Sequence, residues 1–275
     1  MKKDEKRREM IKINRDQTQY YDEYLKHKKY NVFMSLWVNV RKNMMDIRRI
    51  IGAEQYISDL HLKWMGDLSE KRVLDLGCYG GNVLSLTLAR ASLYYLGIDL
   101  SEPAIEILRK QLKENDIKGS EAKAIDFLSP EFKDSDFDVV YAHGVAHHFR
   151  HFDVFLNVLS NHLKPGGIVV TYDPLDTSLL SHAVRGVYRI FQHDKAWEWP
   201  FTKQTFRMIR KHFEIIKVRG IMGYAKWALP LSLISKRWAV KAAAQWHKKD
   251  VKNANRLGSD LWRCLHVTMS WRKPE

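Results

Sequence analysis

The sequence predicts an α/β fold, in which a seven-stranded, mostly parallel sheet carries helices on both faces. Residues 71–172 alternate short apolar runs with helical patterns, which is typical of parallel strands joined by crossover helices. Two further apolar runs, at 213–220 and 264–271, predict a terminal antiparallel hairpin with a long insertion between its strands. A chain of 275 residues that is 45% hydrophobic has the size for one such domain with added segments.

The individual elements follow from local patterns. The five parallel strands are expected at Val73–Leu76, Tyr94–Ile98, Ala122–Ile125, Asp138–Ala142 and Gly167–Tyr172. After the second strand, Ser101 is a suitable N-cap, and Ile105, Leu108 and Leu112 share one face of the helix that follows. A second helix is expected over residues 151–163, where the sequence KPGG ends it.

The chain divides into four parts. Residues 1–70 are helical in pattern and are expected to form an N-terminal cap over the carboxyl edge of the sheet. Residues 71–220 form the core, residues 221–263 form a Trp-rich basic helical insertion, and residues 264–275 supply the last strand of the sheet.

The positive charge is concentrated near the end of the chain. The formal net charge is +14, and residues 201–275 alone carry a surplus of +13. Such a segment suits nucleic acid, an anionic membrane surface, a phosphorylated substrate or simple solvation. Within it, residues 226–249 set Trp among Lys and Arg. That pattern fits a peripheral membrane helix, a lid over an apolar substrate pocket, or an ordinary insertion with a solvated basic face.

Cysteine usage and the first residues bear on the compartment. Cys78 and Cys264 lie in different predicted strands, so no disulfide framework is expected and a reducing compartment is indicated. The start, MKKDEKRREMIK, lacks the apolar centre of a signal peptide, and no apolar run has the length of a membrane span. We expect a cytoplasmic protein, with peripheral contact at a membrane as the open alternative.

The stretch VLDLGCYGG, residues 73–81, predicts a strand followed by a cofactor-binding turn. Gly77 and Gly81 allow close approach of the backbone to a ligand at the carboxyl end of the strand. Asp99 follows the next strand, where an acidic side chain accepts hydrogen bonds from ribose hydroxyls. These features by themselves fit a dinucleotide equally well.

Two further acids favour a different cofactor. Asp75 lies inside the turn, where a carboxylate suits an amine-bearing ligand and repels a pyrophosphate. After the third strand, Asp126 and Phe127 are placed to meet the amine and the ring face of an adenine.

The set Asp75, Gly77, Gly81, Asp99 and Asp126 resembles the class I S-adenosylmethionine-dependent methyltransferases, whose first turn reads close to VLDLGCGTG. The sequences DVVYAHGVAHHF and LKPGG extend the resemblance over roughly residues 71–175. It implies a Rossmann-like core and S-adenosylmethionine as cofactor. By resemblance, Asp75 and Gly77 hold the methionine end, Asp99 holds the ribose, and Asp126 holds the adenine.

The sequence departs from the family pattern at Tyr79, which replaces the middle glycine of the turn; we expect binding to survive because this position contributes mainly its backbone. The resemblance also implies that Tyr20 or Tyr21 closes over the methionine carboxylate. The full set of expected cofactor residues is Tyr20, Tyr21, Asp75, Gly77, Cys78, Tyr79, Gly81, Asp99, Leu100, Asp126, Phe127 and His143.

Methyl transfer from a sulfonium is an in-line displacement that needs an aligned acceptor and, for a hydroxyl or acidic carbon, a base; no metal is required. His147 and His148 after the fourth strand are the candidate bases, and Asp173 after the fifth competes with them. We expect a small-molecule or lipid-like acceptor, methylated at oxygen or carbon. The alternatives are an RNA methyltransferase that uses the basic C-terminal region, and a non-catalytic S-adenosylmethionine-binding protein. The oligomeric state is not predicted.

Overall fold

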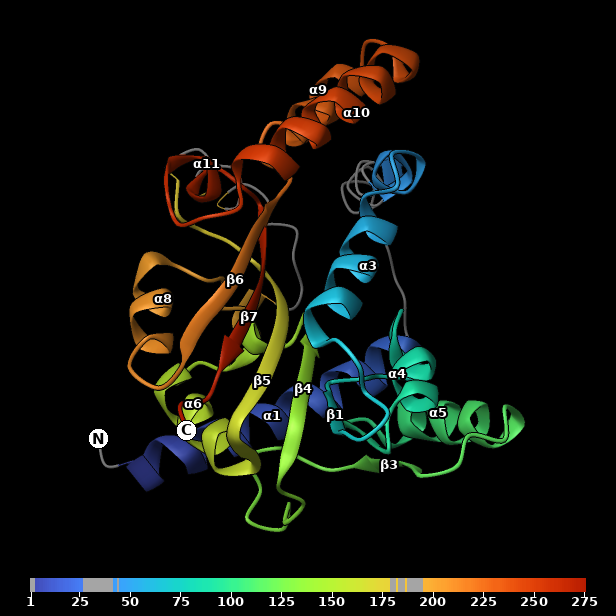
Figure 1. The fold of residues 1–275 in the computed structure, drawn as a ribbon, viewed down its shortest axis with the longest axis vertical. Helices are drawn as coiled ribbons and strands as arrows, with labels where there is room; N and C mark the ends of the chain where they lie inside the picture. The colour runs from blue at the N-terminus through green and yellow to red at the C-terminus, as the bar shows by residue number, and fades with distance from the viewer. Residues whose placement is uncertain (1–2, 27–41, 44, 179–181, 183–185, 187–194) are drawn as a thin grey trace.

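A computed structural model describes residues 3–26, 42–43, 45–178, 182, 186 and 195–275 (Figure 1). Its sheet has seven strands in the order β3-β2-β1-β4-β5-β7-β6. The strands are β1 Arg72–Leu76, β2 Tyr94–Asp99, β3 Ser120–Ala124, β4 Phe137–His143, β5 Leu163–Pro174, β6 Glu214–Ile221 and β7 His266–Arg272. The predicted seven-stranded, mostly parallel sheet is therefore confirmed.

Helices cover both faces of this sheet. The α-helices are α1 Lys3–Lys26, α3 Ala53–Met65, α4 Ser85–Ala91, α5 Glu102–Glu114, α6 Phe152–His162, α8 Lys203–Ile209, α9 Ala228–Ser232, α10 Lys236–Asn253 and α11 Ser259–Trp262. Short 3-10 turns are η1 Ala146–His148, η2 Lys195–Trp197 and η3 Ala225–Trp227. Helices α3, α4 and α5 contribute to one hydrophobic cluster, and α1, α6 and α8 contribute to another.

The helix after β2 forms for the reasons that its sequence suggests. The Ser101 side chain accepts the backbone N–H of Ala104 and caps α5. Ile105, Leu108 and Leu112 are all buried, so the predicted apolar face meets the sheet. Packing of this apolar face holds α5 against β2 and β3. It thereby fixes the position of the carboxyl end of β2.

The last two strands, β6 and β7, form an antiparallel pair, and a long insertion separates them in the sequence. β7 pairs antiparallel with both β5 and β6, and its side chains Val267, Met269 and Trp271 are fully buried. The chain leaves the sheet after β6 and returns at β7, with η3, α9, α10 and α11 between them. In Figure 1, α9 and α10 project as an arm beyond the end of β6.

The N-terminal helices occupy two different places. Helix α1 crosses near the ends of β3 and β4, where its Asn14 and Gln17 contact Asp126 and His148. Helix α3 packs beside the sheet, where the buried His61 ring contacts hydroxyls of β4 and β7. Within residues 1–70, α1 is thus the described helix that lines the pocket at the carboxyl edge.

Candidate functional site

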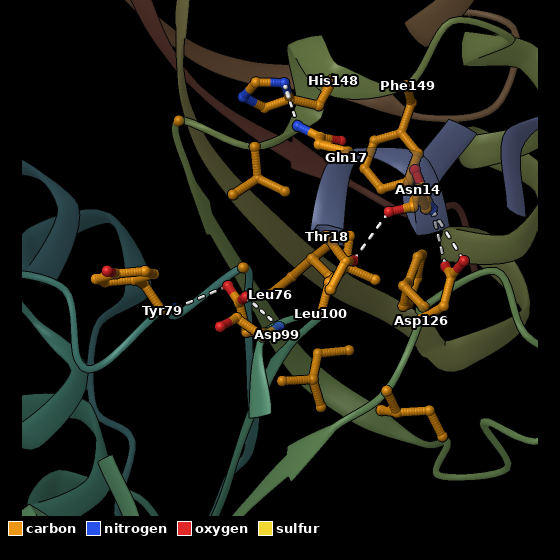
Figure 2. Close-up of a pocket in the computed structure, with 17 residues that line it drawn as sticks. Asn14, Gln17, Thr18, Leu76, Tyr79, Asp99, Leu100, Asp126, His148 and Phe149 are labelled. Carbon is orange, nitrogen blue, oxygen red and sulfur yellow. Dashed lines mark hydrogen bonds between the residues drawn. The ribbon is translucent and has the colours of Figure 1, made fainter. Parts of the chain in front are cut away.

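A pocket of about 260 Å³ opens at the carboxyl ends of the central strands, where the strand order reverses between β1 and β4. This switch point is the usual ligand position in an open α/β sheet. Figure 2 shows its lining, which comes from four strand ends and from α1. The lining residues are Asn14, Gln17, Thr18, Leu76, Gly77, Tyr79, Ile98, Asp99, Leu100, Ser101, Ile125, Asp126, Phe127, Gly144, Val145, His148 and Phe149.

The turn after β1 is tightly packed against the opposite wall of the pocket. Gly77 has a φ of 67°, and a Cβ atom added there would lie 2.3 Å from a methyl of Val145. Only glycine fits that position without displacing the wall. Tyr79 also has a left-handed φ, 51°, although it carries a side chain, and its ring is half exposed. Tyr79 therefore keeps the backbone shape of a glycine turn at a conformational cost.

Asp99 lies at the end of β2 with its carboxylate held at the pocket wall. One oxygen accepts the backbone N–H of Tyr79 at 2.9 Å, and the other accepts the N–H of Ser101 at 3.0 Å. These bonds tie the cofactor turn to the second strand. The Asp99 carboxylate thus lies in the wall of the pocket, and its binding of a ribose stays a prediction.

Asp126 forms the far end of the pocket. Its carboxylate accepts the side-chain amide of Asn14, at 3.0 Å to each oxygen, and the backbone N–H of Leu128. Burial raises the pKa of Asp126, while the hydrogen bonds act in the opposite direction. The neighbouring Phe127 also lines the pocket, and its ring packs against Phe155. An acid that already accepts an amide donor beside an aromatic wall has the chemistry that an adenine amine needs.

Asp75 does not reach the pocket, contrary to the expectation that it faces the methionine end. Its fully buried carboxylate accepts hydrogen bonds from Asn82, Ser85 and Tyr95 at 2.6–2.8 Å. Burial raises its pKa to about 6. Because three neighbouring side chains already donate hydrogen bonds to its carboxylate, Asp75 stabilises the turn from within the core. The Cys78 side chain is likewise buried in the cluster beneath the turn rather than in the pocket.

Of the three candidate bases, His148 alone lines the pocket. Its Nδ1 lies 2.8 Å from the carbonyl oxygen of Trp197 and 3.3 Å from the Gln17 amide. A carbonyl oxygen can only accept, so the shorter contact places the proton on Nδ1 and makes Nε2 the basic nitrogen of the neutral ring. In this tautomer the Gln17 amide nitrogen, which is also a donor, is a contact of Nδ1 and not its hydrogen-bond partner. Burial and the neighbouring His147 ring lower the pKa of His148 to about 4, which keeps it neutral at pH 7.

His147 and Asp173 lie behind His148 and form a buried pair. The Asp173 carboxylate accepts the backbone N–H of His147 at 3.0 Å and contacts its ring Nδ1 at 2.9 Å. Burial raises the pKa of Asp173 to about 7. The two rings His147 and His148 are 4.2 Å apart. Asp173 therefore does not face the pocket as a competing base; it positions the histidine pair.

His143 is also turned away from the pocket that it was expected to line. Its ring stacks on Tyr172 at 4.8 Å, and Tyr172 stacks in turn on His266 at 5.2 Å. The guanidinium of Arg48 donates to the Tyr172 hydroxyl. Strand alternation explains this outcome, because His143 shares the α3 side of the sheet, whereas the next residue, Gly144, lines the pocket.

Sequence reasoning missed the polar side chains of α1 that form the pocket wall. Met10, Asn14 and Gln17 are all buried and recur at the spacing of one helix face. The available signal was that the side-chain amides of Asn14 and Gln17 share a helix face with Met10, while the rest of the helix is charged. Tyr20 and Tyr21 lie in the backbone of α1, but their side chains are outside the described part of the chain.

The fold and the pocket together define a Rossmann-like protein whose site suits an adenosine-bearing cofactor. Residues 74–169 match a family model described as a methyltransferase domain. This region contains the turn, the acids after β2 and β3, and the histidine loop. This part of the core is therefore similar to a methyltransferase domain.

The chain is also similar to several proteins that are named as methyltransferases. A fatty-acid O-methyltransferase of Mycolicibacterium smegmatis is 33% identical over 108 residues, or 39% of this chain and 38% of that protein. A ubiquinone biosynthesis O-methyltransferase of Bordetella pertussis is 35% identical over 118 residues, or 41% and 48%. Geranyl diphosphate C-methyltransferase of Streptomyces coelicolor A3(2) shares the fold at a TM-score of 0.57 and 13% identity, covering 80% and 79%. The chain spans less than half the length of these two sequence relatives.

Proposed function

We propose that this protein transfers a methyl group from S-adenosylmethionine to a small-molecule or lipid-like acceptor, at oxygen or carbon. The observation that carries the proposal is the pocket at the β1/β4 switch point, which joins a glycine turn, Asp99, Asp126 and His148 in one cavity. The relatives named above support the acceptor class, since one is a fatty-acid O-methyltransferase and the other an O-methyltransferase of ubiquinone biosynthesis.

In this proposal the backbone of the turn at Gly77 approaches the methionine end of the cofactor, Asp99 accepts the ribose hydroxyls, and Asp126 accepts the adenine amine. When bound, S-adenosylmethionine supplies an electrophilic methyl group on a sulfonium. Transfer of that methyl group to the acceptor atom would leave S-adenosylhomocysteine, with the electron pair of the broken carbon–sulfur bond, as the second product. The protein's contribution is to align the acceptor and to remove its proton.

His148 is our choice for the group that takes that proton. The Trp197 carbonyl holds its Nδ1–H, so its Nε2 is the free base of the neutral ring. Because the pKa of His148 is lowered to about 4, it is a weak base. It therefore suits an acceptor whose proton is already acidic, such as a phenol, an enol or an activated carbon, better than a simple alcohol.

The finer setting belongs to the same proposal. We place the protein in the cytoplasm, with peripheral contact to a membrane through residues 226–249. Among the residues that the structure describes, no helix has the length and hydrophobicity to cross a bilayer. Nucleic acid remains the less favoured partner, because the basic charge of the C-terminal region is its only support.

The proposal is tested by incubating the purified protein with methyl-labelled S-adenosylmethionine and a whole-cell extract, and then counting label in lipid, small-molecule, RNA and protein fractions. Label in the lipid or small-molecule fraction is the expected result. Label in RNA would replace the acceptor class. Absence of label in every fraction, with intact cofactor binding, would favour a non-catalytic binding protein.

Two substitutions test the assigned roles. Asp99→Ala is expected to weaken S-adenosylmethionine binding by about tenfold or more, measured by calorimetry, because a charged acceptor to the ribose is lost. His148→Ala is expected to lower turnover while leaving cofactor affinity nearly unchanged. Unchanged affinity in the Asp99 variant would remove the ribose assignment, and normal turnover in the His148 variant would remove the base.

A further inference from the structure

Exposed apolar side chains gather at one end of the molecule. Of the ten large apolar residues that are exposed in the described part of the chain, six lie at 45–50 or at 227–238. These two segments are neighbours in space, because Ile47 packs against Ala228, Ala239 and Ala243 of the α9–α10 arm. A concentration of exposed apolar surface of this kind marks an interaction site more often than a solvated face.

The apex of the arm carries the most exposed of these residues. We call residues 233–238, which comprise the link between α9 and α10 and the first three residues of α10, the arm tip. Leu233 and Ile234 are each 76% exposed, and Trp238 is 63% exposed. The Ser235 side chain caps α10 by accepting the backbone N–H of Trp238, so Trp238 is held in the first turn of the helix. Figure 1 shows α9 and α10 projecting away from the sheet, with the turn between them at the outer end.

The charge around the tip has a single sign. Residues 226–249 contain six Lys or Arg and no Asp or Glu. Lys236 and Arg237 are exposed at the tip itself, and Lys241 follows one turn later. Among the ion pairs of the described residues, the one that involves these three is Lys236 with Asp46, at the long distance of 3.9 Å. The tip therefore combines an apolar apex with a collar of cations that are little neutralised.

The arm leaves the sheet at the carboxyl ends of the parallel strands, where the cofactor pocket also lies. β6 and β5 both pair antiparallel with β7, and β5 pairs parallel with β4. β6 therefore runs parallel to β4, and its carboxyl end, from which the arm departs, lies at the pocket edge. If the arm tip binds a surface, the pocket at the carboxyl ends of the strands would therefore face that surface.

We propose that the arm tip inserts Leu233, Ile234 and Trp238 into the headgroup layer of an anionic lipid bilayer, while Arg237 and Lys241 contact lipid phosphates. The inference deepens the peripheral membrane contact proposed above and rests on it. Aliphatic and indole side chains at an apex, surrounded by cations, match the requirements of an interfacial anchor. Docking through this tip brings the pocket edge to the surface where a lipid-like acceptor resides.

Other occupants fit these features less well. A nucleic acid would use the cations but has no use for the exposed Leu233 and Ile234, since its backbone is read by charge. A stable protein interface buries about 800 Å² on each partner, and a projecting turn with three exposed apolar side chains offers a convex point instead. A bilayer accommodates such a point because its headgroup layer deforms around an inserted side chain.

The test is co-sedimentation of the full-length protein with vesicles of phosphatidylcholine alone or of an equimolar mixture of phosphatidylcholine and phosphatidylglycerol. The wild-type protein is expected to bind the mixed vesicles and to bind pure phosphatidylcholine much more weakly. Leu233→Ser/Ile234→Ser is expected to lower the partition coefficient by about tenfold, since two aliphatic side chains no longer enter the bilayer. Arg237→Gln/Lys241→Gln is expected to lower it roughly fivefold per charge removed.

A matched control is Val83→Ser/Leu93→Ser, which removes two exposed aliphatic side chains outside the arm. It should bind vesicles as the wild type does. Equal binding by the arm and control variants would overturn the proposal, as would binding by the wild type to RNA homopolymer in place of the mixed vesicles. Formation of a dimer that the arm variant abolishes, without vesicle binding, would equally overturn it in favour of a second copy.

The same variants separate this inference from the proposed activity. S-adenosylmethionine affinity, measured in solution without vesicles, should be unchanged in Leu233→Ser/Ile234→Ser, because the arm tip is absent from the pocket lining. Loss of vesicle binding with retained cofactor affinity supports the arm as the membrane anchor. Vesicle binding that depends on the arm, in a protein that labels no acceptor, would retire the transferase proposal and keep the anchor.

Discussion

At the scale of single residues, the site depends on how each side chain is satisfied by its neighbours. Asp99 and Asp126 lie in the pocket with their carboxylates held by backbone amides, whereas Asp75 is fully enclosed by three side-chain donors. All three are acids near strand ends, and local sequence alone does not separate them. The available donors decide which acid is enclosed in the core and which lines the pocket.

Tyr79 carries a conformational cost that glycine would remove. An L-residue in the left-handed region costs about 1–2 kcal/mol. Substitution by glycine would remove this cost, but the greater backbone entropy of glycine in the unfolded chain offsets part of the gain in stability. Tyr79→Gly is therefore expected to raise the free energy of unfolding by about 0.5–1 kcal/mol in chemical denaturation. Asp116→Gly, at a φ of 49°, is the comparison, and it should gain less because Asp tolerates this region better. A loss of stability in Tyr79→Gly would mean that the ring packs more than its exposure indicates.

His61 should make the fold sensitive to acid. It is fully buried, and desolvation lowers its pKa from 6.5 to about 3, so the folded state keeps the ring neutral. Between these values the unfolded chain binds a proton that the folded chain does not. Stability from this group is thus complete above pH 6.5 and is lost as pH falls toward 3, by at most about 1.4 kcal/mol per pH unit.

His61→Leu measures this contribution through the slope of stability against pH. At pH 7 the variant should lose about 1–3 kcal/mol, because the Tyr141 hydroxyl loses its partner. Between pH 6.5 and 5, however, its free energy of unfolding should fall less steeply than that of the wild type. Equal slopes in the two proteins would place the acid sensitivity on other groups.

At the scale of elements, α1 is the part of the site that is most distant in sequence from the rest. Asn14 and Gln17 connect it to Asp126 and His148, more than a hundred residues away. Lys6 pairs with Asp153 of α6 at 2.8 Å, and the exposure of both side chains limits that pair to a small contribution. The helix is therefore held mainly by its buried face, which is also the wall of the pocket.

Cofactor binding should consequently stabilise α1. Addition of S-adenosylhomocysteine is expected to slow amide hydrogen exchange in residues 10–18 and in the turn at 77–82, because both line the pocket. Helix α10 serves as the internal control, since it contributes no residue to that lining, and its exchange should not change. Unaltered exchange in α1, with protection in the turn, would show that the helix does not contact the bound cofactor.

At the scale of the whole molecule, the fold depends on its last strand. β7 lies between β5 and β6 and fully buries Trp271, so it supplies hydrogen bonds and core contacts on both sides. The sheet therefore joins residues 266–272 to strands that lie before the long insertion in the sequence. A large excursion is tolerated between β6 and β7, because the entropy cost of closing a loop grows slowly with its length.

Removal of β7 should abolish cooperative folding. A chain that ends at Leu265 is expected to show no cooperative thermal transition by circular dichroism, because β5 and β6 each lose a partner and the core loses Val267, Met269 and Trp271. A chain that ends at Lys273 retains the strand and should melt as the full chain does. A cooperative melt of the shorter chain would mean that the sheet closes without β7.

The sequence by itself determined the layered fold, the position of the cofactor turn and the acids after β2 and β3, because these depend on strand periodicity and on the backbone of a local turn. It also indicated the hairpin at the end of the sheet, since both strands are continuous apolar runs. Tertiary structure alone decided which chemically similar residues face the pocket: His148 does, whereas His143, His147, Asp75 and Asp173 do not. It also brought the amides of α1 to the site. The physical reason is that the direction of a side chain and the identity of its buried partners depend on packing between segments that are remote in the chain.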